Sequence, residues 1–289
     1  MSEPSEHDPA REPAGDLAPQ PHTDPPPEIG ASEVPAPTSP DPSADPAPWG
    51  LKGAILLPLL SFGGQLVLGL LVGGMAAAAL MLLDPNITSN PEDFQEAILL
   101  VSLGPVALAS SILTLGLIYV SVTVVARRPF LASLGLTRPS APGLARSGGL
   151  GAAMALLYVG IAGVFPPDPE VELGGPLTRL AESGPFGHAL WLGLAVLVAP
   201  VIEELLFRGY MFLGARRRLG PVGAGVAVTI TFVALHLPET GTYWPAVAGI
   251  ASMATALIMV MHRTGKLTYC IAGHLGYNAA LAGLSILPG

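Results

Sequence analysis

Long apolar stretches separated by short polar segments make up most of the chain after residue 50. A helix needs roughly 20 mostly apolar residues to cross a bilayer. Seven stretches approach or exceed this length, at residues 54–83, 97–126, 146–165, 186–213, 221–238, 243–262 and 267–287. The pattern predicts an all-α fold, a polytopic integral membrane bundle of about seven transmembrane helices.

The first fifty residues follow a different pattern. They contain 14 prolines, ten acidic residues and one arginine, with few large apolar side chains. Such a segment cannot bury enough apolar surface to offset the entropy lost on ordering. We expect residues 1–50 to form a disordered, Pro-rich acidic tail and residues 51–289 to form the transmembrane domain.

Composition supports the membrane class and narrows the chemistry. The chain is 51% hydrophobic and 12% charged, whereas soluble domains carry about 25% charged residues. Beyond the tail, 12 basic residues balance 11 acidic ones, which excludes a basic surface for nucleic acid. The single cysteine, Cys270, excludes an internal disulfide and a cysteine zinc cluster.

The loops between the predicted spans alternate in charge. The segments 84–96, 166–185 and around Glu239 are mainly acidic, whereas the intervening segments hold the bases Arg127, Arg128, Arg138, Arg146, Arg216, Arg217, Arg218, Arg263 and Lys266. Cytoplasmic loops of membrane proteins collect Lys and Arg. The alternation predicts a multi-pass protein of the plasma membrane with its N-terminus in the cytoplasm and its C-terminus outside.

Charged side chains interrupt the fourth apolar stretch. It contains Glu203, Glu204 and Arg208, and each charge at a helix centre costs roughly 2.5–3.5 kcal/mol on insertion scales. Glu204 and Arg208 are four residues apart and can form an ion pair on one face. Glu203 lies about 100° away around the helix, so it is the candidate general base or acid.

Two later stretches each place polar or aromatic groups four residues apart on one helix face. Phe232 precedes His236 in the fifth stretch, and His274 precedes Asn278 in the seventh. Together with Glu203 they supply a carboxyl group, a histidine and a pair of hydrogen-bond donors. Hydrolysis of an amide needs a base for water, a proton carrier and donors to the oxyanion.

These residues closely resemble the three motifs of the CPBP intramembrane protease family, which includes CAAX-processing endopeptidases and bacteriocin-immunity (Abi) proteins. The resemblance rests on Glu203-Glu204-x-x-x-Arg208, Phe232-x-x-x-His236 and His274-x-x-x-Asn278, and its core covers residues 186–287. It implies an intramembrane endopeptidase that acts on a membrane-associated protein or peptide.

The resemblance also implies a role for each candidate residue. Glu203 would activate water with His236 as its partner, and His274 with Asn278 would stabilise the tetrahedral intermediate. Glu204 and Arg208 match the supporting members of the first motif. Glu203, His236 and His274 could also hold a zinc ion with an open position for water, so the metal-dependent and the metal-free glutamate mechanism are equally open.

Two other functions use the same buried charges. A transporter or channel would use them as a proton or ion site, and its mark would be an inverted internal repeat. A non-catalytic relative would act as an immunity factor or binding scaffold. The polar residues lie only in the second half and all motif positions are filled, so we favour the peptidase.

The predicted span limits create one conflict. Glu203 lies about ten residues from the cytoplasmic end of its predicted span and His236 about 15 residues from the same side, or roughly 15 and 22 Å at helical rise. For the two to meet, the fifth helix must start later, tilt or be broken.

Overall fold

Helices form all the regular structure in the described part of the chain. The computed structural model describes residues 47–169 and 175–285. In chain order the elements are α1 (Gly50–Leu83), η1 (Ile87–Ser89), α2 (Pro91–Tyr119), η2 (Val120–Val125), α3 (Phe130–Ser133), α4 (Ala141–Val164), α5 (Gly175–Glu182), α6 (Pro185–Leu192), η3 (Gly193–Val198), α7 (Ala199–Glu204), η4 (Leu205–Phe212), α8 (Leu213–Thr240), α9 (Trp244–Thr264) and α10 (Leu267–Ser285). The expected all-α fold is confirmed.

Five helical segments of the described residues are long and apolar enough to cross a membrane. They are Gly50–Leu83, Pro91–Val125, Ala141–Val164, Pro185–Thr240 and Trp244–Thr264. The protein is therefore an integral membrane protein. The longest, at 56 residues, holds two predicted spans, and α10 follows as a further helix. The predicted count of seven spans stays a prediction.

Most of the predicted tail lies outside the described residues. The exceptions are residues 47–50, where Ala47 is fully buried and Trp49 stacks on Tyr210 with ring centroids 4.6 Å apart. Helix α1 then begins at Gly50. The packed part of the chain thus starts a few residues earlier than the change in composition suggested.

The helix ends follow local sequence signals. Asn90 caps α2 by accepting a hydrogen bond from the Glu92 N–H, and Pro91 occupies the first turn, where its missing N–H has no helical partner to lose. Gly265 ends α9 in the left-handed conformation, at φ 63°, which glycine adopts at little cost.

The fourth and fifth spans are joined by a sharp turn at Gly220. Its φ of 70° and ψ of 168° interrupt the helical backbone between Leu213 and Thr240. Glu203 lies 17 residues before this turn and His236 lies 16 residues after it. The two side chains are therefore at similar depth, and the expected conflict disappears because the fourth helix runs on to the turn.

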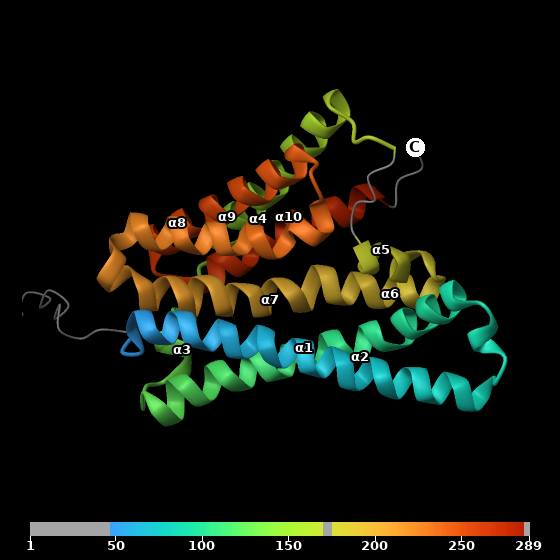
Figure 1. Ribbon diagram of the computed structural model, residues 1–289. Coiled ribbons are helices and arrows are strands. Elements are labelled where there is room, and N and C mark those ends of the chain that lie inside the picture. The colour runs from blue at the N-terminus through green and yellow to red at the C-terminus, as the bar shows by residue number, and fades with distance from the viewer. Residues whose placement is uncertain (1–46, 170–174, 286–289) are drawn as a thin grey trace, which may run out of the picture. The chain divides into compact units, whose positions relative to one another are not determined.

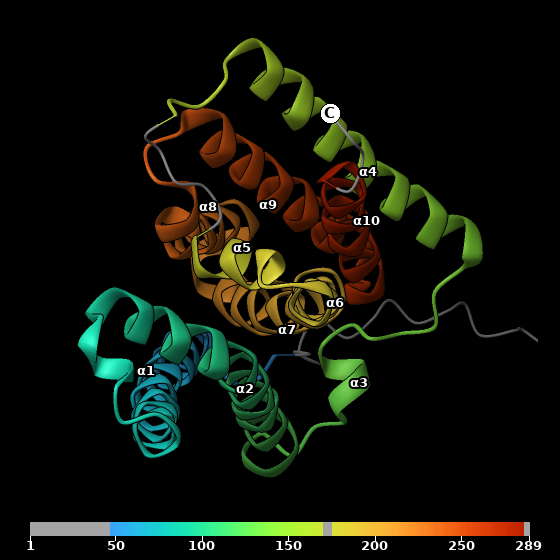
Figure 2. The ribbon, with the colours of Figure 1, turned by 90° about the vertical axis from the view of Figure 1, so that its right-hand side faces the viewer.

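The fourth span, from α6 to η4, lies between two groups of helices (Figures 1 and 2). Helices α1 and α2 pack on one side of it, and α4, α8, α9 and α10 lie on the other. The motif residues on the fourth span therefore face helices α8, α9 and α10.

Helices α4 and α10 approach each other through glycines. A Cβ atom on Gly151 would collide with the Gly273 carbonyl, and one on Gly276 would collide with the backbone of Gly148. Small residues let membrane helices pack at backbone distance. The close contact fixes α10, and with it His274 and Asn278, against the rest of the bundle.

Candidate active site

Two π-helical segments flank the glutamates of the first motif, and its Arg208 lies in the second of them. Helix α7, which carries Glu203 and Glu204, spans only Ala199–Glu204 between η3 and η4. A π-turn shifts hydrogen bonds from the fourth to the fifth preceding residue and is frequent at functional sites. The local cause in η3 is Pro200, because proline has no N–H to donate to an earlier carbonyl.

Asn278 satisfies a carbonyl that the π-turn leaves free. The Ala199 N–H bonds to the Leu194 carbonyl, and Pro200 has no N–H, so the Ala195 carbonyl has no partner from either position. The Asn278 side-chain amide donates to this carbonyl at 2.7 Å. Asn278 therefore holds α10 to the fourth span with one of its two side-chain N–H groups. The second N–H group can donate a hydrogen bond within the cavity.

The ion pair predicted from the spacing of Glu204 and Arg208 is present and fully buried. Arg208 Nη1 donates to Glu204 Oε1 at 2.8 Å, and both side chains are 0% exposed. Arg208 Nη2 donates to the Ala254 carbonyl at 3.2 Å, and its guanidinium lies 4.7 Å from the ring centre of Phe232. Pairing and hydrogen bonding offset part of the cost of burying these charges.

His274 lies between the two glutamates. Its Nδ1 donates to Glu204 Oε1 at 2.8 Å, and its Nε2 lies 3.7 Å from Glu203 Oε2. A carboxylate bound to one ring nitrogen fixes the orientation of the imidazole and directs the other nitrogen. Glu204 thus positions His274, and Glu203 faces the nitrogen on the opposite side of the ring.

His236 is held by its own helix. Its Nδ1 donates to the Phe232 carbonyl at 2.7 Å, and its ring lies 4.4 Å from the Phe232 ring. A carbonyl can only accept, so Nδ1 carries the proton. In the neutral ring Nε2 is then unprotonated and able to accept a proton.

One cavity of about 400 Å³ collects the predicted residues of all three motifs. Glu203, His236, His274 and Asn278 all line it. Glu204 and Arg208 do not line it and lie behind His274. The side chain of Glu203 is 27% exposed, so water can reach the carboxyl group.

The cavity contains one carboxyl group that the sequence reasoning missed. Glu239 lines it and is close enough to His236 and Glu203 to interact electrostatically with both. The sequence placed it in a loop, whereas α8 continues to Thr240. The available signal was its spacing, since a residue three positions after His236 shares its helix face.

The three candidate zinc ligands, Glu203, His236 and His274, line the same cavity. In the described part of the chain, no group of three or more His, Cys, Asp and Glu side chains is arranged to hold a metal ion. The zinc site stays a prediction.

One known protein family matches the part of the chain that contains the three motifs. Residues 185–280 match the family described as Rce1-like, type II CAAX prenyl endopeptidase. The match confirms the resemblance to the CPBP and CAAX protease families and indicates an intramembrane endopeptidase acting on membrane-associated protein substrates. Comparisons with curated proteins and with solved structures found no match.

The Rce1-like region runs from the start of α6 into α10. It contains all six predicted site residues and Glu239 as well. Helices α1, α2 and α4 lie outside it. The candidate site residues thus lie in the part of the chain that resembles known proteases. The earlier helices pack against this part.

Proposed function

We propose that this protein is an endopeptidase in which Glu203 and His236 activate a water molecule within the membrane. The observation that carries the proposal is the single cavity lined by Glu203, His236, His274 and Asn278, contributed by three separate helices. Polar groups inside a membrane are costly and mark functional sites. Here they meet around a space large enough for water and a peptide backbone.

The proposed reaction starts with proton transfer from water to the Glu203 carboxylate, assisted by Nε2 of His236. The hydroxide attacks the peptide carbonyl carbon, and the carbonyl oxygen becomes an oxyanion. Protonated His274 and the remaining N–H of Asn278 donate hydrogen bonds to that oxygen. The captured proton then passes to the leaving amine as the C–N bond breaks, which yields a carboxylic acid and an amine.

Glu204 and Arg208 act indirectly in this scheme. Their buried ion pair places a carboxylate oxygen 2.8 Å from His274 Nδ1. That contact holds the imidazole in position, with Nδ1 donating to Glu204 and Nε2 on the side of the cavity. They are positioning residues, because neither lines the cavity.

The proposed location is the plasma membrane, with the N-terminus in the cytoplasm. The described basic residues support this orientation, since all except Arg179 and the buried Arg208 lie at helix ends on one side of the bundle and loops rich in Lys and Arg stay in the cytoplasm. The proposed substrate is a membrane-associated protein or peptide.

The test is cleavage by the purified protein and by a Glu203→Gln variant. Glutamine keeps the shape of the side chain and cannot take a proton, so we expect cleavage to fall on the order of 10²–10⁴-fold. The matched control is Glu96→Gln, which changes an exposed carboxylate and should leave the rate unchanged. Full activity in Glu203→Gln would contradict the mechanism.

Metal analysis of the same preparations addresses the zinc alternative. Zinc bound in stoichiometric amount to the wild type and lost in Glu203→Gln would favour a metal-dependent reaction. Activity that persists in metal-free protein would favour the glutamate mechanism.

A further inference from the structure

Charge divides the helix ends of the bundle into two groups. The first group, here called the basic end, comprises the α2–α4 connection with Arg127 and Arg138, the Gly220 turn with the preceding Arg216–Arg218, and the last turn of α9 with Arg263. The opposite group, here called the acidic end, includes the α1–α2 connection with Asp84 and Glu92.

The cavity lies in the half of the bundle next to the acidic end. On α8 it is lined by the final turns, where His236, Glu239 and Thr240 lie, and on α9 by the first turns from Ala246 to Met253. Thr178 of α5, which belongs to the α4–α6 connection on the acidic end, also lines it. No lining residue comes from a connection on the basic end.

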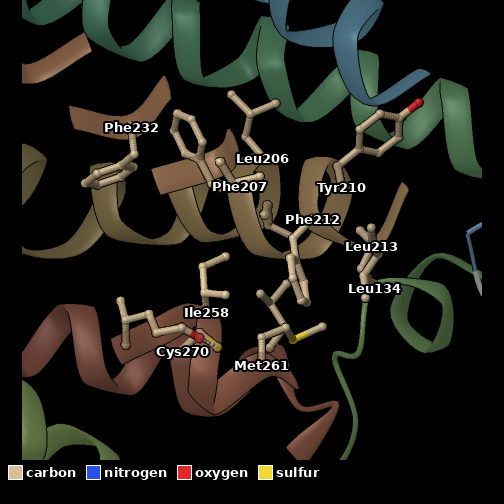
Figure 3. Close-up of a cluster of buried hydrophobic side chains, with 14 of the residues drawn as sticks. Leu134, Leu206, Phe207, Tyr210, Phe212, Leu213, Phe232, Ile258, Met261 and Cys270 are labelled. Carbon is tan, nitrogen blue, oxygen red and sulfur yellow. Dashed lines mark hydrogen bonds between the residues drawn. The ribbon is translucent and has the colours of Figure 1, made fainter. Parts of the chain in front are cut away.

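A layer of buried side chains separates the cavity from the basic end. Arg208 and Cys270, which do not line the cavity, are 0% exposed on its side toward the basic end. Beyond them Met261 is 1% exposed and Leu267 is 0% exposed. Figure 3 shows Met261 and Cys270 among the buried apolar side chains of this region. The Leu267 N–H also bonds to the carbonyl of Gly135, which joins α10 to the segment after α3. Buried side chains therefore fill the space between the cavity and the basic end.

We infer that the peptide substrate reaches Glu203 from the extracytoplasmic side of the membrane. The inference rests on the proposed function for the identity of the substrate. The basic end faces the cytoplasm by the distribution of Lys and Arg, and the lining of the cavity reaches the connections of the acidic end and none of the basic end. The substrate class is therefore a polypeptide segment exposed at the outer surface, such as a secreted or membrane-anchored protein, and not a protein held at the cytoplasmic surface.

The single cysteine makes this inference directly testable. Cys270→Ala removes the only thiol, and new cysteines can then be placed one at a time. Ala199→Cys reports on the cavity, since Ala199 lines it one helical turn from Glu203. Ser89→Cys and Thr264→Cys, both exposed, report on the acidic and the basic end respectively. Intact cells are treated with a membrane-impermeant maleimide, with and without permeabilisation.

We expect Ala199→Cys and Ser89→Cys to react in intact cells and Thr264→Cys to react only after permeabilisation. Reaction of Ala199→Cys only after permeabilisation, or failure to react in either state, would overturn the inference. Reaction of Thr264→Cys in intact cells would overturn it as well, because the basic end would then lie outside. Each variant is first checked for membrane insertion and a monodisperse elution profile, so that only folded protein is scored.

The labelling result is independent of catalysis. If the cavity is labelled from outside but Glu203→Gln cleaves as well as the wild type, the proposed mechanism fails and the access route stands. If Glu203→Gln is inactive and the cavity is labelled only from inside, the mechanism stands and the access route fails.

Discussion

Each polar side chain of the site is held by a second group, and that second group determines which atom is available. Glu204 occupies Nδ1 of His274, the Phe232 carbonyl occupies Nδ1 of His236, and the Ala195 carbonyl occupies one N–H of Asn278. These contacts leave Nε2 of both imidazoles and one amide N–H for chemistry. Residue by residue, the site is preorganised by hydrogen bonds, as catalysis in a low-dielectric environment requires.

The buried ion pair gives a prediction at this scale. Arg208→Met leaves the fully buried Glu204 carboxyl group without its guanidinium partner, so we expect the folded state to lose about 3–5 kcal/mol. The double variant Arg208→Met with Glu204→Gln removes both charges and should recover much of that stability. The measurement is the thermal midpoint of the detergent-solubilised protein.

Activity separates the positioning role of the pair from its structural role. The double variant should stay largely inactive in the cleavage assay, because a neutral amide replaces the carboxylate whose charge-assisted hydrogen bond holds His274 in position. A double variant that is both stable and fully active would show that Glu204 and Arg208 contribute packing alone.

At the scale of elements, local irregularities bring the motifs together. The π-turns on either side of α7 and the turn at Gly220 set the rotation and depth of Glu203 relative to His236. The glycine contact between α4 and α10 sets the distance at which His274 approaches. Substitutions in these elements that shift a helix slightly should therefore lower the rate of catalysis, although the substituted residues lie outside the cavity.

Gly151→Ala tests the glycine contact. The new methyl group would meet the Gly273 carbonyl, so α10 must move away from α4; overpacking of this kind costs typically about 1–3 kcal/mol. We expect lower thermal stability and a rate reduced at least tenfold. Gly149→Ala is the matched control, since nothing lies within 4 Å of the added atom. Equal behaviour of the two variants would contradict the role of the contact.

At the scale of the whole membrane domain, the first helices support the Rce1-like region from outside. Trp49 stacks on Tyr210 and donates its indole N–H to the Tyr210 carbonyl at 3.0 Å. The Tyr210 hydroxyl in turn bonds to Ser121 at the end of the second span. The start of α1 is thereby tied to η4, the π-turn directly after Glu204.

Trp49→Ala should weaken this connection. Loss of the stacked ring and the indole hydrogen bond is expected to destabilise the protein by about 2–4 kcal/mol, somewhat less than removal of a fully buried Trp. The thermal midpoint should fall by several degrees. Trp244→Ala, which removes a side chain that is 55% exposed, should change it much less; an equal fall in both variants would contradict this role.

The sequence by itself determined the all-α membrane fold, the uneven distribution of charge and the residues of the candidate site. These follow from local rules, because apolar length predicts a span and a spacing of four residues predicts a shared helix face. Only the tertiary structure decided that Glu203 and His236 lie at one depth, that Glu239 joins the cavity and that Asn278 bonds to Ala195. These depend on a turn at one glycine, on the extent of α8 and on a carbonyl freed by Pro200. Such features arise from packing between distant segments, which hydropathy and spacing along the chain do not encode.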